Sequence, residues 1–288
     1  MNSKVEMVFW DVQHGHATYI KSPNNRHIVI DLGTGDYSSN NEAFSPLRHL
    51  KYKYGVNQLD YVIITHPHLD HISDILNFDD LRPKVLLCPR LTDQEIMESV
   101  RAGDEKKFKK YCEIENRYTN SIVGGPNDPD ILNNYGGMKF KTFSAEGCSH
   151  DNFNNQSIIT VIEYENIKVV IPGDNEDCSF AELMQSASFK SAIKDADILL
   201  APHHGRESGY NNDFVSLVNP RLTIVSDGRY CDTSANNRYS GKSRGWRVYK
   251  KNRTSSMRYC LTTNSDGEVY VEFGINSNGE NYLQVRID

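Results

Sequence analysis

The sequence of 288 residues lacks long apolar runs, closely spaced cysteines and an excess of basic residues. No apolar run is long enough to cross a bilayer, which argues against a membrane-spanning protein and against a membrane partner. The first residues, MNSKVEMVFWDV, lack the basic and apolar segments of a signal peptide. The 32 Lys and Arg against 38 Asp and Glu give a net charge of −6, which excludes a generally basic nucleic-acid-coating protein. We therefore expect a cytoplasmic protein.

The six cysteines are spread from Cys88 to Cys260 and form no CxxC pair. This spacing disfavours a disulfide framework and a cysteine-ligated structural metal, so free thiols are expected. Hydrophobic residues make up 38% and charged residues 24% of the chain, which is the composition of a globular protein rather than a disordered one. The length allows one large hydrophobic core or two smaller ones.

Short runs rich in β-branched and aromatic residues alternate with segments of helical spacing. Strands are predicted at 5–10, 16–22, 26–33, 59–65, 83–89, 138–143, 156–164, 167–174, 196–202 and 221–227, with three more after residue 257. Helices are predicted at 45–55, 70–78, 92–100, 104–118, 176–185 and 211–218. The alternation predicts an α/β fold of one domain, residues 1–288, in which two β-sheets are flanked by helices. A helical insertion is predicted at about 92–137.

The densest cluster of polar side chains is the stretch THPHLDHISD, which follows the apolar strand YVII. It contains His66, His68, Asp70 and His71, and neutral imidazoles with carboxylates suit zinc, manganese or iron(II). Four ligands within six residues cannot all reach one ion, so the loop is expected to serve two ions. A solvated polar loop is the alternative, which the density of histidines disfavours.

Two distant segments also place polar groups directly after hydrophobic strands, where α/β proteins gather their sites. Asp174 lies in IPGDNED, and the pair His203 and His204 lies in APHHG. Alternatively, Asp174 is a turn residue and the two histidines are a structural pair. The presence of the first cluster makes both alternatives less favoured. His150, in GCSHDNF, is a weaker candidate because a loop histidine explains it nearly as well.

These motifs resemble those of a known family. THPHLDH matches the HxHxDH signature of the metallo-β-lactamase fold, and VIDLG with Asp31, GDNED and APHHG are similar to its other ordered motifs. FWDVQHGHATYI, NNQS, HHGR and TNSDG resemble the corresponding elements of the hydrolase domains of ComEC/Rec2-like competence proteins. The resemblance runs from residue 5 to about 272, apart from the insertion. It implies the metallo-β-lactamase αββα sandwich, in which helices flank two mixed β-sheets.

The resemblance also implies a metal-dependent hydrolase with two divalent ions, zinc or manganese, that share an activated hydroxide. His66 and His68, with His150, would hold the first ion. Asp70, His71 and either His203 or His204 would hold the second ion, with Asp174 bridging the two. The implied catalytic residues are Asp70, Asp174, His204 and Asp31, and Asp31 would act by orienting a ligand histidine or a backbone turn.

Two features depart from the competence proteins. Their DVGQG glycine and glutamine are Gln13 and His14 here, and their usual acid is His16. His14 and His16 either line the substrate site or serve the structure. The competence proteins also carry membrane helices, which this chain lacks, so a free-standing hydrolase is expected.

We expect the substrates to be phosphodiesters of DNA, RNA or a nucleotide. The stretch SGKSRGWRVYKKNR (240–253) is a local basic and aromatic patch suited to phosphates and bases, although a solvated helix face explains it equally well. Arg206, Arg238 and Tyr239 are further candidates for binding phosphate. One alternative is a hydrolase of small esters, lactones or phosphocholine-type substrates, with 92–137 as a lid. A non-catalytic metal-binding interaction module is the other.

Overall fold

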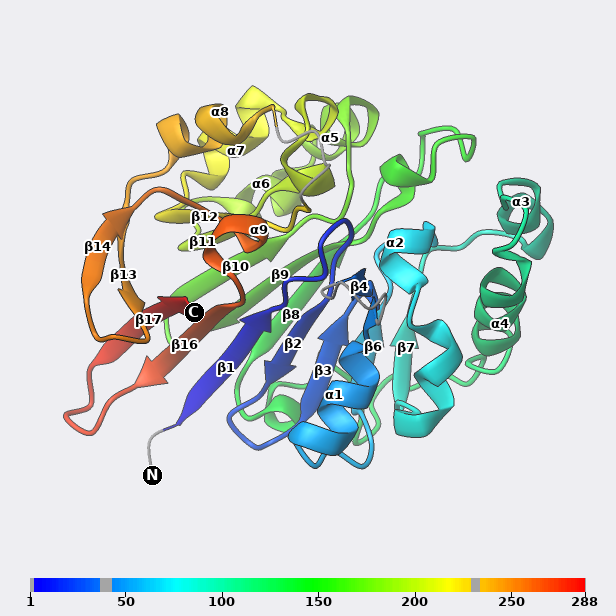
Figure 1. Ribbon diagram of the computed structural model, residues 1–288, viewed down its shortest axis with the longest axis horizontal. Helices are drawn as coiled ribbons and strands as arrows, with labels where there is room; N and C mark the ends of the chain where they lie inside the picture. The colour runs from blue at the N-terminus through cyan, green and yellow to red at the C-terminus, as the bar shows by residue number, and fades with distance from the viewer. Residues whose placement is uncertain (1–2, 37–42, 229–233, 288) are drawn as a thin grey trace.

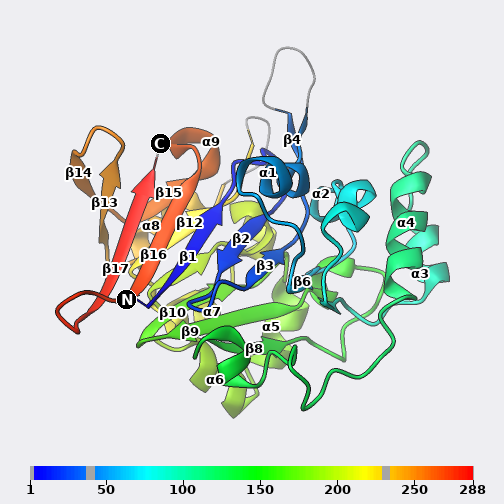
Figure 2. The same cartoon turned by 90° about the horizontal axis from the view of Figure 1, so that it is seen from below.

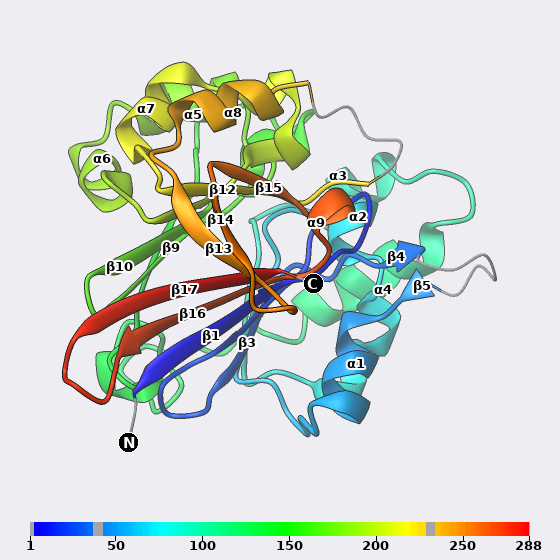
Figure 3. The ribbon, with the colours of Figure 1, turned by 60° about the vertical axis from the view of Figure 1, so that its left-hand side comes forward.

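Two β-sheets packed face to face form the centre of the protein, and helices cover their outer faces (Figure 1). The computed structural model describes residues 3–36, 43–228 and 234–287. Seen from the side, the layers follow in the order helices, sheet, sheet, helices (Figure 3). This arrangement confirms the predicted αββα sandwich.

The first sheet has nine strands and is mixed, because β3 pairs in parallel with β6 while β1 pairs antiparallel with β2 and β16. Figure 2 shows several of these strands side by side. In sheet order the strands are β14 (Ser255–Arg258), β13 (Trp246–Lys250), β17 (Asn281–Ile287), β16 (Val269–Ile275), β1 (Lys4–Phe9), β2 (Thr18–Lys21), β3 (His27–Ile30), β6 (Tyr61–Ile63) and β7 (Val85–Leu87).

The second sheet has six strands and is also mixed, because β10, β11, β12 and β15 run parallel while β8 and β9 form antiparallel pairs. In sheet order the strands are β15 (Cys260–Thr262), β12 (Leu222–Val225), β11 (Ile198–Leu200), β10 (Ile167–Ile171), β9 (Ile159–Tyr164) and β8 (Lys139–Phe143). A small ribbon pairs β4 (Gly35–Asp36) with β5 (Ala43–Phe44).

The helices fall into two groups along the chain. Those before the second sheet are α1 (Pro46–Lys53), α2 (Leu69–Ile72), η1 (Ile75–Leu81), α3 (Asp93–Glu98), α4 (Glu105–Glu115) and η2 (Leu132–Tyr135). Those within or after it are η3 (Phe153–Gln156), α5 (Asp177–Leu183), α6 (Ala187–Ile193), η4 (Pro202–Gly205), η5 (Glu207–Gly209), α7 (Asn212–Val218), α8 (Asn236–Lys242) and α9 (Thr263–Asp266). In the described residues no helix combines the length and the apolar character needed to cross a membrane.

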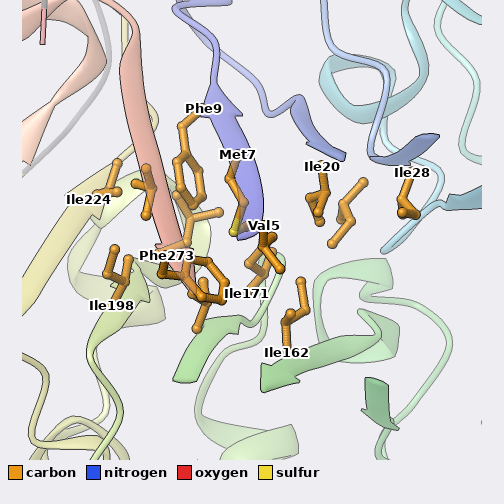
Figure 4. Close-up of a cluster of buried hydrophobic side chains, with 14 of the residues drawn as sticks. Val5, Met7, Phe9, Ile20, Ile28, Ile162, Ile171, Ile198, Ile224 and Phe273 are labelled. Carbon is orange, nitrogen blue, oxygen red and sulfur yellow. The ribbon is translucent and has the colours of Figure 1, made fainter. Parts of the chain in front are cut away.

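The core between the sheets follows from the two-residue period of the strands. On β1 the side chains of Val5, Met7 and Phe9 point inward, and they meet side chains of the second sheet such as Ile171 and Ile198 (Figure 4). The intervening Val8 points to the opposite face and packs in the cluster that includes the buried side chains of α1, η1 and α4. A third cluster lies between the second sheet and α5, α6, α7 and α8. Each sheet is therefore buried on both faces along much of its length.

Local sequence signals placed several helix starts correctly. The Ser45 hydroxyl accepts from the Arg48 N–H, and Pro46 occupies the first turn of α1. Thr92 and Glu95 form the predicted capping box of α3. The segment predicted as a helical insertion, 92–137, contains α3, α4 and η2.

Three features differ from the predictions. Helices α6 and α8 were not predicted, and the patch 240–253 contains the strand β13 rather than a helix face. The expectation of free thiols is wrong for Cys148 and Cys178, which form a disulfide because the loop before β9 lies against the start of α5. Cys88, Cys112 and Cys260 are free, and Cys231 lies outside the described residues.

Helix α4 carries a carboxyl group in an unfavourable setting. Burial and the Asp93 carboxylate raise the pKa of Glu115 to about 7, from the ordinary 4.5. Because the folded protein then binds this proton more tightly than the unfolded chain, the free energy of unfolding falls as pH rises from about 4.5 to about 7. We expect Glu115→Gln to stabilise the protein by about 1–2 kcal/mol at pH 8, a value reduced for the partial exposure of the group.

At pH 4 the same substitution should have almost no effect, because the native carboxyl is already neutral there. Urea unfolding at both pH values measures the difference. Glu113→Gln, at an exposed position on the same helix, is the control and should show no such pH dependence. An equal effect of Glu115→Gln at both pH values would contradict the explanation.

Candidate metal centre

Histidine and aspartate side chains from five loops meet at one edge of the two sheets. These loops follow β1, β3, β6, β10 and β11, and the loop that precedes β9 adds Asn154 beside them. Each strand is apolar and pinned in the core, so the first polar residues beyond it emerge at the same edge. Figure 1 shows the ends of β1 and β6 and the short helix α2 close together on this side of the molecule.

Close backbone packing joins the first three loops. The Asp70 carbonyl accepts from the His16 N–H, and the His71 carbonyl accepts from the Leu32 N–H. A Cβ atom on Gly15 would lie 2.3 Å from the Asp70 carbonyl oxygen, and one on Gly33 would lie 2.5 Å from it. The two glycines are therefore required because their neighbours leave no room for a side chain.

The Asp31 carboxylate, fully buried behind the site, holds the ligand loop in place. One of its oxygens accepts from the Thr65 N–H at 2.7 Å. The other accepts from the Thr65 hydroxyl at 2.7 Å, His71 Nδ1 at 2.8 Å and His16 Nδ1 at 2.9 Å. Although burial alone would raise the pKa of Asp31, these histidines hold it well below its usual value. The predicted orienting role of Asp31 thus has a structural basis.

Asp70, His71, Asp174 and His204 bring one ligand atom each within 4.8 Å of one another. The Nε2 atom of His71 lies 3.3 Å from Asp174 Oδ1, and that of His204 lies 3.3 Å from both Asp174 Oδ2 and Asp70 Oδ2. His204 donates through Nδ1 to the Ser226 carbonyl at 3.0 Å, and His71 donates through Nδ1 to Asp31. Each imidazole is therefore oriented by its far nitrogen and presents Nε2 to the carboxylates.

The charges in this group agree with a cation site. Burial lowers the pKa of His204, but the carboxylates of Asp174 and Asp70 outweigh it and raise this pKa to about 9. The pKa of His71 is likewise raised well above its usual value, against the effect of burial, by Asp174, Asp31 and Asp70. The buried carboxylate of Asp174 and the half-buried carboxylate of Asp70 thus attract positive charge to the point where the Nε2 atoms converge. Two imidazoles and two carboxylates are a donor set suited to zinc or manganese.

His66 and His68 form a second group of histidines next to Asp174. His66 Nε2 lies 2.9 Å from His68 Nδ1 and 3.8 Å from Asp174 Oδ2. Burial lowers the pKa of both histidines, most strongly that of His66, so both are neutral and available as ligands near pH 7. The Asp174 carboxylate therefore adjoins His66 as well as His71 and His204.

The two histidines of the APHHG turn have different surroundings. His203 has φ +47°, His204 has φ +54° and Gly205 has φ +76°, so three successive residues are left-handed. Whereas His204 joins Asp70 and Asp174, His203 Nδ1 lies 2.9 Å from Glu176 Oε1 and 2.9 Å from the Ser208 hydroxyl. Of the alternatives left open by the sequence, the geometry favours His204 as the ligand and leaves His203 beside the site.

Glu176 and Asn154 were missed by the sequence analysis. Burial alone would raise the pKa of Glu176, but hydrogen bonds with His203 and Asn152 lower it to about 2. Asn154 donates to Glu176, and among the described residues its buried Oδ1 atom has no hydrogen-bond partner. Both residues lie within motifs already noted, GDNED and NNQS, and this position was the signal that could have identified them.

The structure places the other three predicted histidines in different surroundings. His14 lies at the mouth of the site, with Nε2 3.1 Å from Asp70 Oδ2, whereas His16 is buried beneath the ligands between Asp31 and Thr18. His150 is not brought to the cluster, because it lies exposed with Nδ1 2.8 Å from Glu95 Oε1.

The three candidates for phosphate binding also differ in position. Arg206 lies beside the site, with Nη1 3.1 Å from His203 Nε2. Arg238 is paired with Glu207 and lies over the ring of Tyr210, and Tyr239 is fully buried. Of the three, Arg206 is the one that contacts His203, next to the metal centre.

Comparisons with known proteins identify the family to which the chain is similar. The sequence model described as the metallo-beta-lactamase superfamily matches residues 10–226. ComE operon protein 3 of Bacillus subtilis is 24% identical over 262 residues, which cover 83% of this chain and 30% of that protein. A UPF0173 metal-dependent hydrolase of Saccharolobus solfataricus is 33% identical over 73 residues, 25% of this chain and 29% of that protein. The chain spans less than a third of the length of either relative.

A solved structure shares the fold over nearly the whole chain. A mutant of the CmlA beta-hydroxylase aligns with 96% of this chain and 54% of its own, with a TM-score of 0.54 and 10% sequence identity. At that identity the likeness concerns the fold alone, and that protein is named for a hydroxylase. The reaction therefore has to be argued from the residues of the site.

The position of Asp31 leads to a first prediction for the site. We expect Asp31→Asn to destabilise the metal-free protein by about 3 kcal/mol, because an amide group would face the donors of His16, His71 and Thr65. Asparagine tolerates the left-handed backbone at this position, where φ is +60°, so backbone strain is not the cause. Urea unfolding with a chelator present measures the loss. The exposed control Asp80→Asn should change stability by about 0.5 kcal/mol or less.

The different surroundings of the paired histidines lead to a second prediction. We expect His204→Ala to weaken the binding of one ion roughly 100-fold or more, because it removes a ligand atom. His203→Ala should weaken it by only about tenfold, which is the lower end of the effect of residues that support metal ligands. Competition with a chromogenic zinc chelator measures both variants. Equal losses in the two variants, or a larger loss in His203→Ala, would reverse the assignment.

Proposed function

The chain belongs to the metallo-beta-lactamase superfamily, and we propose that it is a metal-dependent hydrolase that cleaves phosphodiesters of DNA, RNA or a nucleotide. The observation that carries the proposal is that the Asp174 carboxylate adjoins two groups of candidate ligands. The first group is His66 and His68, and the second is Asp70, His71 and His204. This set fits two divalent ions, zinc or manganese, with the carboxylate between them.

Ions held there would activate water and offset the negative charge that develops on a phosphoryl group. The residues around them would position the substrate. Asp31 and Ser226 fix the orientation of two ligand imidazoles, so that little rearrangement is needed during the reaction. The loops that carry the ligands are joined by backbone hydrogen bonds, which keeps the relative positions of the groups constant.

Arg206 and His203 are the groups suited to the leaving side of the reaction. The Arg206 guanidinium contacts the His203 ring and can bind a non-bridging phosphate oxygen. His203 is held by Glu176 and Ser208 beside the ligands, and once Arg206 turns from Nε2 to a phosphate oxygen, a proton carried at Nε2 would be placed to pass to a leaving alkoxide. Phosphodiesters need both functions, whereas a lactone brings no phosphate for the arginine to bind. This difference favours the phosphodiester over the ester and lactone alternatives.

The central role of Asp174 predicts the effect of its removal. We expect Asp174→Ala and His68→Ala, combined in one variant, to lose both ions and at least 1,000-fold in cleavage rate, because the bridge and one terminal ligand are gone. Metal analysis and a rate assay on the same preparation measure both effects. Asp177→Ala removes an exposed aspartate from the start of α5 and should keep both properties. An unchanged cleavage rate in the double variant would refute the proposed site.

A substrate panel tests the reaction class. It should contain labelled single-stranded and double-stranded DNA, RNA, cyclic dinucleotides, bis-p-nitrophenyl phosphate, a carboxylic ester and a lactone, each with zinc or manganese. We expect metal-dependent cleavage of at least one phosphodiester. Cleavage of the ester or lactone alone, by protein that carries its metal, would overturn the phosphodiester assignment.

A further inference from the structure

A basic hollow lies on the nine-stranded sheet, away from the metal ligands. It has a volume of about 530 Å³ and is lined chiefly by Tyr249, Lys250, Lys251, Arg253, Tyr270 and Arg286. Among the described residues, which end at Ile287, no aspartate or glutamate lines it. In a chain with a net charge of −6, four cationic side chains around one cavity form a strong local contrast.

Strand register produces the arrangement of the hollow. Tyr270 on β16 pairs with Arg286 on β17, which in turn pairs with Tyr249 on β13. The neighbouring residues Val248 and Val285 point into the core between the sheets, so the row Tyr270, Arg286, Tyr249 faces outward. The Arg286 guanidinium lies 5.9 Å from the centre of the Tyr270 ring, and Tyr249 is 37% exposed. Two aromatic rings thus flank a cation on an open face.

The same row becomes covered on the other side of β16. There Tyr270 pairs with Val8, and Val8 pairs with Tyr19. Val8 and Tyr19 are buried in the cluster that includes Leu47 and Leu50 of α1. The hollow is therefore the uncovered continuation of a row that α1 buries further along the sheet.

The hollow lies at the end of the sheet that carries the metal ligands. Lys250 pairs with Ile287, Ile287 pairs with Val269, and Val269 pairs with Phe9 at the end of β1. Three strand spacings, roughly 14 Å, separate Lys250 from Phe9. The loop after Phe9 leads to His14, which contacts Asp70. A chain bound in the hollow could therefore extend along this edge to the metal centre.

We propose that the basic hollow binds single-stranded nucleic acid and presents a neighbouring segment of the strand to the metal centre. Lys251, Arg253 and Arg286 would contact backbone phosphates, and Tyr249 and Tyr270 would stack on bases. Stacking on tyrosine needs unpaired bases, which is why the proposal concerns single strands rather than duplexes. This inference rests on the proposed function, because it names the substrate class that the same centre would act on.

Binding measured apart from cleavage tests the proposal. The probe is a fluorescein-labelled phosphorothioate oligothymidylate, which resists hydrolysis, added to the metal-loaded full chain and followed by fluorescence anisotropy over a range of salt concentrations. We expect Arg253→Glu with Arg286→Glu to raise Kd at least tenfold. The slope of log Kd against log salt should fall by roughly 1.4, or about 0.7 for each lost phosphate contact.

Lys106→Glu with Lys109→Glu is the matched control, because it makes the same charge change on the exposed face of α4. Unchanged metal content and circular dichroism show that each variant is folded. If the hollow variant and the α4 variant bind the probe equally, the proposal is overturned, whatever the substrate panel shows. If the hollow variant alone loses binding but no phosphodiester is ever cleaved, the proposed function fails while the nucleic-acid site stands.

Substitutions of Tyr249 distinguish the contribution of base stacking from that of charge. We expect Tyr249→Ala to raise Kd about tenfold with little change in the salt slope, because a stacking platform is lost and no cation is removed. Tyr249→Phe keeps the ring and should bind within about twofold of the native protein. A Tyr249→Ala variant with native affinity would contradict a stacked base and overturn the proposal as stated.

Discussion

The candidate site depends on one buried carboxylate. Asp31 lies at the end of β3 with no exposure to solvent, and its two oxygens accept four hydrogen bonds from three residues of other loops. A buried charge is tolerated only when it is paired and fully hydrogen-bonded, so the carboxylate and its donors have to be assembled together. Folding of the first sheet therefore brings His71 and Thr65, and with them the whole ligand loop, to fixed positions.

Much of the fold followed from the sequence because its signals are local. Short runs rich in β-branched and aromatic residues predicted β1 and the parallel central strands, and capping residues predicted the starts of α1 and α3. Helix α6 was missed although Ser186 caps it, because its apolar positions Phe189, Ala192 and Ile193 are few. The cysteine pairing was missed because it joins residues 30 apart in sequence, and only the packed chain brings them together.

The sequence predicted which types of residue would act as ligands. It did not predict which of the two neighbouring histidines in APHHG would do so. Residue types and strand ends identified the histidines and aspartates that meet at the edge of the sheets. Which histidine of the pair in APHHG faces Asp174 depends on three successive left-handed residues, and sequence spacing carries no such information. Glu176 and Asn154 escaped attention because a carboxylate or an amide in a turn is common without any role. Their importance became visible only through their contacts with each other and with His203.

The geometry of this centre also depends on two glycines that are not ligands, Gly15 and Gly33. Neither contributes a ligand, a charge or a side-chain contact, yet any Cβ at either position would collide with the carbonyl oxygen of Asp70. Relief of that collision has to move the backbone between Asp70 and His71, and both side chains move with it. A random-mutagenesis screen for defective metal binding would therefore recover these glycines together with the ligands. Their absence of a side chain is itself part of the coordination geometry.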